Sequence, residues 1–158
     1  MRQFIDIIAE AVVSKLYHGT SIEALAGILS SGAINASPPD DYDDGHVGVS
    51  LTFDFDTAMK FAEEAKERDW DNQWNSPVND SVVLAFAQNA ISNTVGGKKV
   101  LWDGSNSEAE FRTFGPIPAS MITDVKVDKP SLEWWIESFE ETGDDGKAAA
   151  LRELKERL

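Results

Sequence analysis

The chain has 158 residues, the length of one domain, and 42% of them are hydrophobic, which is enough to build a core. It has no cysteine, which excludes disulfides and thiolate metal sites, and no apolar run approaches the roughly 18 residues that a membrane span needs. Fourteen basic residues face 28 acidic ones, for a formal net charge of −14. The negative electrostatic field of such a chain opposes non-specific binding to DNA or RNA and favours a basic protein partner. The alternative is that the charge serves solubility alone.

The first third of the chain is expected to be rich in helix. Residues 1–14 contain an apolar run that two acids interrupt, which indicates a helix packed on the domain rather than a signal peptide. The segment "KLYH" (15–18) is typical of a short strand. The segment "SIEALAGILSSG" (21–32) has apolar residues at helical spacing, with Ser21 as its expected N-cap and Gly32 as its stop.

A loop, a strand and a second helix follow. Residues 35–48 are rich in Pro, Gly and Asp and predict a loop, whereas "VSLTF" (49–53) alternates like a strand. The segment "DTAMKFAEEAKERDW" (56–70) predicts a helix with Asp56 as its cap. The buried stripe of this helix is expected to comprise Ala58, Phe61, Ala62 and Ala65.

The second half of the chain changes to strands. Four segments with short polar connections have the composition of strands: 81–87, 98–104, 108–114 and 122–128. Helical spacing returns in 131–141 and 147–158. A helix-rich first half, a strand-rich second half and a helical end argue for an α+β fold and against a doubly wound sheet.

Two short motifs carry residue types that suit a binding site. In "HGT" (His18, Gly19 and Thr20) the glycine lets a backbone approach a ligand closely, and the imidazole can donate to a hydroxyl. Ser50 and Thr52 stand two apart on a predicted strand and therefore share a face. Each motif alone also fits a structural role, as a histidine bonded to a nearby carbonyl or as ordinary cross-strand pairing.

A third motif brings two acids together. Glu108 and Glu110 in "EAEF" also stand two apart on a predicted strand and share a face. Carboxylates in this arrangement can stabilise a positive centre in a transition state, as they do beside an oxocarbenium ion. An exposed strand face is the structural alternative.

The order of these motifs resembles the ADP-ribosyltransferase superfamily. "YHGT" before a helix, "SLT" leading into a helix and "EAEF" leading into a strand cover residues 15–128, which leaves 1–14 as an N-terminal helix and 129–158 as a helical tail. The resemblance implies a split, mostly antiparallel sheet that holds NAD in a cleft. The chain combines the His-first motif of one branch with the Glu-x-Glu motif of the other, and it has Ser-Leu-Thr, a Ser-x-Thr form, where that other branch has Ser-Thr-Ser. It is similar to small bacterial and phage forms, which implies the cytoplasm of a bacterial or phage-infected cell.

The resemblance also implies the chemistry of the two acids. Glu110 matches the catalytic glutamate, which holds the 2′-hydroxyl of the nicotinamide ribose and stabilises the oxocarbenium ion as the glycosidic bond breaks. Glu108 matches the earlier acid, which helps the acceptor nucleophile attack. NAD is then a substrate, and no metal is needed.

The resemblance assigns binding roles to the other motif residues. His18 would contact the adenosine ribose, the backbone of Gly19 would clamp the nicotinamide amide, and Phe61 is a candidate to stack on nicotinamide. The full set of expected NAD-binding residues is His18, Gly19, Thr20, Ser50, Thr52 and Phe61.

The expected activity is mono-ADP-ribosyl transfer from NAD to a protein acceptor, with a basic acceptor favoured by the charge of the chain. Nucleic acid is disfavoured as a partner on the same ground, and no membrane partner is expected. The alternative is a catalytically inactive relative, a binding or virion protein that acts through its acidic surface.

Overall fold

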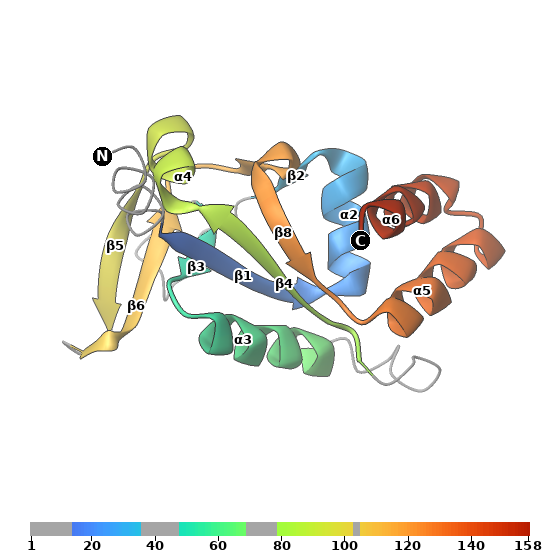
Figure 1. Ribbon diagram of the computed structural model, residues 1–158, viewed down its shortest axis with the longest axis horizontal. Coiled ribbons are helices and arrows are strands. Elements are labelled where there is room, and N and C mark those ends of the chain that lie inside the picture. The colour runs from blue at the N-terminus through green and yellow to red at the C-terminus, as the bar shows by residue number, and fades with distance from the viewer. Residues whose placement is uncertain (1–13, 36–47, 69–78, 103–104) are drawn as a thin grey trace, which may run out of the picture.

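The computed structural model describes residues 14–35, 48–68, 79–102 and 105–158 (Figure 1), with the backbone alone described for 65–68, 102 and 105–109. The expected N-terminal helix and nearly all of the expected loop at 35–48 lie outside these residues. In chain order the elements are β1 Lys15–Ser21, α2 Ile22–Ser31, β2 Ala33–Ile34, β3 Ser50–Thr52, α3 Phe55–Arg68, β4 Ser81–Ala87, α4 Gln88–Thr94, β5 Gly97–Trp102, β6 Ser105–Thr113, β7 Ile117–Pro118, β8 Ile122–Lys126, α5 Lys129–Glu141 and α6 Asp145–Arg157.

The main sheet has six strands in the order β5-β6-β3-β1-β4-β8, and every neighbouring pair is antiparallel. The expected mostly antiparallel α+β architecture is therefore confirmed. One register pair, Tyr17 with Thr52, joins β1 to β3, whereas β1 and β4 pair over seven residues. The two halves of the sheet are thus held together at a narrow point. A short ladder of β2 with β7 stands apart from the main sheet.

Strand β1 is longer than the sequence pattern predicted. The expected strand ended at His18, but the structure continues it to Ser21, and β4 pairs with it along its whole length. His18, Gly19 and Thr20 therefore lie inside a central strand and not in a strand-to-helix turn. The extension arises because the apolar strand β4 supplies partners that local composition does not reveal.

The caps of the first two helices follow from single side chains. The hydroxyl of Ser21 accepts from the Ala24 backbone N–H, and Gly32 ends α2 at a φ of 88°, so both predicted signals of this helix are confirmed. The predicted cap of α3 was wrong. Asp54, not Asp56, accepts from the backbone N–H and the hydroxyl of Thr57. Those two bonds lower the pKa of the Asp54 carboxyl.

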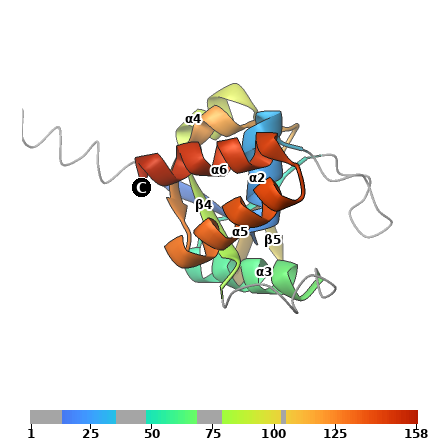
Figure 2. The same ribbon diagram turned by 90° about the vertical axis from the view of Figure 1, so that its right-hand side faces the viewer.

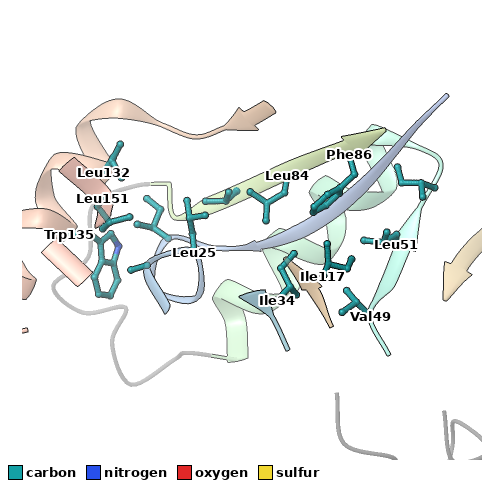
Figure 3. Packing of buried hydrophobic residues seen from close by; sticks show 14 of the residues in the cluster. Leu25, Ile34, Val49, Leu51, Leu84, Phe86, Ile117, Leu132, Trp135 and Leu151 are labelled. Atoms are coloured by element: carbon teal, nitrogen blue, oxygen red, sulfur yellow. The ribbon is translucent and has the colours of Figure 1, made fainter. Parts of the chain in front are cut away.

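The last two helices share the core of the sheet. In Figure 1 they gather with α2 at one end of the molecule, while β5 and β6 lie at the other, and Figure 2 shows α5 and α6 crossing in front of α2. Leu132, Trp135 and Leu151 are buried, and Figure 3 shows them continuous with Leu25 and Leu84. The indole N–H of Trp135 also donates to Asp80, the buried residue just before β4, over 2.9 Å. Removing the segment 129–158 would therefore expose one face of a shared core.

Among the described residues, no helix is long and apolar enough to cross a membrane.

Candidate functional site

A pocket of about 180 Å³ opens between β1, β3, β6 and the adjoining face of α3. It lies where β1 and β3 are joined by their single residue pair. Six of the eight residues singled out from the sequence line it: His18, Gly19, Ser50, Thr52, Phe61 and Glu110. Tyr17 and Leu51 complete the wall. Three consecutive motifs, separated by 32 residues from His18 to Ser50 and by 60 residues from Ser50 to Glu110, therefore meet in one place, because β3 pairs with both β1 and β6.

The two remaining sequence-predicted residues are placed differently. Thr20 does not line the pocket, since it is buried within β1 opposite Val82. Glu108 lies on β6, but its side chain is outside the described part of the chain. Alternation along a strand puts residues 108 and 110 on the same face of β6.

A short hydrogen-bonded chain crosses the pocket from β1 to β6. The ring of His18 contacts the Ser50 carbonyl oxygen through Nδ1 at 3.2 Å, and the Ser50 hydroxyl donates to Oε2 of Glu110 at 2.8 Å. Ser50 thus contacts both other residues, through its backbone on one side and its side chain on the other. The register explains the geometry, because Thr52 stands opposite Glu110, and Ser50, two residues before Thr52 on the same face of β3, stands opposite Arg112.

The protonation of His18 follows from its surroundings. Burial lowers the pKa of its ring, and the hydrogen bond to the Ser50 carbonyl opposes that effect only in part. The ring is therefore neutral at pH 7. A carbonyl oxygen only accepts, so the single ring proton sits on Nδ1, and Nε2 is left as an acceptor. An acceptor at this place can receive a hydrogen bond from a hydroxyl group, such as that of a sugar.

Sequence reasoning missed Arg112. Its Nε–H donates to Oε1 of Glu110 and forms an ion pair with it, and the two side chains are only 12% and 15% exposed. Together with Ser50 it leaves each oxygen of the carboxylate with a partner. The signal was available in the sequence, because Arg112 follows Glu110 by two positions on a strand and so shares its face.

Gly19 has a packing role that the sequence did not reveal. A Cβ at this position would lie 1.9 Å from the Ala58 carbonyl oxygen and 2.8 Å from the Ala62 nitrogen, both in the backbone of α3. Glycine is therefore needed here for α3 to rest directly on β1. The same contact brings Phe61, which lies on α3 between Ala58 and Ala62, to the edge of the pocket.

The aromatic residues near the pocket divide by exposure. Phe61 was expected in the buried stripe of α3, but it is 48% exposed and lines the pocket, so that expectation was wrong, whereas Ala58 and Ala62 are fully buried. Phe55 packs edge-on against Tyr17 with ring centroids 5.8 Å apart. An exposed aromatic at a pocket rim is a surface on which a flat ring can stack.

Thr52 stabilises the turn between β3 and α3. Its hydroxyl accepts from the Asp54 backbone N–H at 3.2 Å, and its side chain is buried. Val49 and Leu51, which alternate with Ser50 and Thr52 along the strand, are buried in the core. The hydroxyl-bearing face of β3 therefore points to the pocket and the apolar face to the core, although Leu51 also borders the pocket.

No group of three or more His, Asp or Glu side chains that could hold a metal occurs within the described residues. A larger groove of about 600 Å³ lies between α5 and α6, with ion pairs between Arg152 and Glu140 and between Lys155 and Glu133 on its walls. It contains none of the residues that the motifs single out. Of these two cavities, the pocket at Glu110 is the one that the residues of the three motifs line.

Comparison with known proteins gives matches at the level of structure. No family model and no curated protein matches the chain. Three solved structures of DarT from Thermus sp. 2.9 share its fold. The complex with NAD+ is 16% identical, covers 82% of this chain and 90% of its own, and has a TM-score of 0.53. The complex with carba-NAD+ is 15% identical, covers 84% and 92%, and has a TM-score of 0.50. The complex with ADP-ribosylated ssDNA is 14% identical, covers 83% and 90%, and has a TM-score of 0.50.

These likenesses establish the fold and correct one expectation. The chain has a DarT-like fold with a mostly antiparallel sheet, which agrees with the fold class that the sequence led us to expect. The expectation of a protein acceptor with nucleic acid disfavoured was wrong, because a protein of this fold occurs in complex with ADP-ribosylated ssDNA. The reasoning failed because net charge is a sum over the whole chain, whereas binding depends on the local field at the site.

Proposed function

We propose that this protein is an NAD-dependent ADP-ribosyltransferase whose acceptor is a single-stranded nucleic acid. The observation that carries the proposal is the chain of contacts from His18 through Ser50 to Glu110, set in a pocket on a DarT-like fold. A purely structural use of these residues would not require a carboxylate, a hydroxyl and a neutral imidazole to converge on one cavity.

The proposed reaction breaks the bond between nicotinamide and C1′ of its ribose. The bonding electrons leave with nicotinamide, a positive charge develops on the ribose, and the acceptor then bonds to C1′ and loses a proton. Glu110 is the only charged residue among the described residues of the pocket wall. Its carboxylate stabilises the developing cation, an electrostatic contribution of about 10²- to 10³-fold in rate for groups of this kind.

The described walls fit one part of NAD better than the whole. A volume of about 180 Å³ is below the roughly 300 to 1,000 Å³ of typical small-molecule sites, so the pocket would enclose the nicotinamide end and leave the rest along its rim. Phe61 offers a stacking surface, and Nε2 of His18 accepts from a ribose hydroxyl. Because the described lining contains no Lys or Arg, the pyrophosphate would remain in contact with solvent.

The acceptor is assigned by analogy with the DarT complex and by the local charge. The net charge of −14 is not spread evenly, because residues 97–113 hold three basic and three acidic residues and are neutral in sum. This segment includes β5 and all of β6, the strand of Glu110. A nucleic acid approaching there meets no excess of negative charge from these strands.

The proposal is tested by nicotinamide release from NAD, measured with and without a single-stranded DNA oligonucleotide. Glu110→Gln keeps the size of the side chain and removes its charge, so both hydrolysis and transfer should fall by about 10²-fold or more. Glu108→Gln should reduce transfer to the oligonucleotide and spare much of the hydrolysis by water, since its expected role concerns the acceptor.

Three further outcomes are informative. Duplex DNA of the same sequence is the matched control for the acceptor, and equal labelling of duplex and single strand would contradict the single-strand assignment. Unchanged nicotinamide release in Glu110→Gln would refute the mechanism. Binding of NAD without any release by the unmodified protein would favour the non-catalytic alternative.

A further inference from the structure

Arg112 is the charged residue nearest to Glu110 that the proposed chemistry does not use. It donates to Oε1 of Glu110 while Ser50 donates to Oε2, so the carboxylate is gripped at both oxygens. A carboxylate has about four acceptor positions, so this grip leaves two of them for a ligand. Arg112 does not itself line the pocket, and its side chain is only 12% exposed.

The backbone around this pair is fixed from both sides. Arg112 pairs with Ser50 on β3 and with Lys98 on β5, and Glu110 pairs with Thr52 and with Val100 in the same two strands. Both residues therefore sit in the middle of a three-strand ladder, where their Cα atoms have little freedom. Their spacing of two residues places the side chains on one face, about 6.6 Å apart at the backbone, which a folded arginine spans.

We propose that Arg112 is a positioning residue that holds the Glu110 carboxylate in its pocket-facing orientation. The assignment of a catalytic task to Glu110 rests on the proposed function, but the grip of Arg112 on the carboxylate does not. An acid that is 15% exposed and has lost its cationic partner can regain solvation only by rotating toward water. Such a rotation would break the bond to Ser50 and withdraw the acid from the pocket.

The structure offers a matched control for the charge. Lys98 is directly opposite Arg112 on β5, so it shares its face of the sheet, and it is exposed to solvent. Lys98→Gln removes one positive charge beside the same strand without removing the contact to Glu110. Arg112→Gln removes the same charge together with the contact, and Arg112→Lys restores the charge without the planar N–H geometry.

The first measurement is the rate of nicotinamide release over a range of NAD concentrations. Arg112→Gln should lower kcat about 10- to 100-fold, a part of the loss expected for Glu110→Gln, and should change KM less than about threefold. Arg112→Lys should recover part of kcat, and Lys98→Gln should match the unmodified protein. A loss in Lys98→Gln equal to that in Arg112→Gln would overturn the proposal, because it would show an effect of net charge.

The second measurement does not depend on activity. The ¹³C resonance of the Glu110 carboxyl carbon is assigned by its disappearance in Glu110→Gln, and it should shift in Arg112→Gln but not in Lys98→Gln. In the double variant, the loss in Tm should be smaller than the sum of the losses in Arg112→Gln and Glu110→Gln. Each single variant already removes the ion pair, so the second substitution cannot remove it again. Additive Tm changes together with an unshifted resonance would refute the proposal that Arg112 holds the Glu110 carboxylate. Inactivity of the unmodified protein with a shifted resonance would instead refute the proposed function alone.

Discussion

Replacing Gly19 by alanine tests how β1 and α3 are held together. The new Cβ would lie 1.9 Å from the Ala58 carbonyl oxygen and within 3 Å of two more backbone atoms of α3. Ordinary contact begins near 3.4 Å, so the helix backbone must retreat by about 1.5 Å. No rotamer change relieves the overlap, because every atom in conflict belongs to the backbone.

The cost of this change follows from the size of the displacement. Inserting one methyl group into a well-packed region usually costs about 1 to 3 kcal/mol, and a backbone conflict of this depth belongs at or above the upper end. A loss of about 3 kcal/mol is a large part of the roughly 5 to 15 kcal/mol by which domains are stable. With a urea m-value of about 2 kcal/mol per molar, the unfolding midpoint should fall by about 1.5 M.

Gly27→Ala is the matched control for this experiment. Gly27 is in the middle of α2, and a Cβ there meets nothing within 4 Å. Alanine at this position should stabilise the protein by about 0.5 to 1 kcal/mol through helix propensity. Urea unfolding followed by circular dichroism measures both variants. A loss of less than about 1 kcal/mol in Gly19→Ala would refute the close packing of α3 on β1.

Three further predictions concern the core, the titration of the site and the aromatic rim. Trp135→Phe removes the donor to Asp80, and urea unfolding should show a loss of about 1 to 3 kcal/mol. The pKa of His18 is lowered in the folded state, so its contribution to stability is complete above its unfolded value of about 6.5 and is lost as the pH falls below it. His18→Asn should therefore flatten the decline of Tm just below pH 6.5, and an unchanged slope would contradict the assignment. Phe61→Ala should raise the KM for NAD with little change in Tm, whereas Phe114→Ala, also exposed but outside the pocket lining, should leave KM unchanged.

Local sequence patterns determined most of the regular elements. The apolar run of β4 was predicted from residue 81 to 87 as the structure has it, and the two caps of α2 were predicted from Ser21 and Gly32. Alternation on β3 also predicted that Ser50 and Thr52 share a face, and both line the pocket. These features depend on neighbours within a few residues, so the pattern of the sequence contains the information for them.

The elements that sequence analysis missed depend on weak local signals. Helix α4 has seven residues and no side-chain cap, and β2 and β7 have two residues each. Asp54 and Asp56 are both plausible caps by composition, and only the positions of Asp54 and Thr57 in the folded turn decide between them. Short elements form because tertiary contacts stabilise them, since they are below the length at which local propensity suffices.

The site shows the same division between local and tertiary information. The motifs predicted the residue types and, through alternation, the faces of Ser50 and Glu110, whereas Arg112 was missed. Only the pairing of β3 with β1 on one side and β6 on the other placed them in one pocket. The requirement for Gly19 likewise became visible only when α3 was seen to rest on β1. Both facts depend on contacts between segments far apart in the chain, and a strand's sequence specifies its faces but does not specify its neighbours.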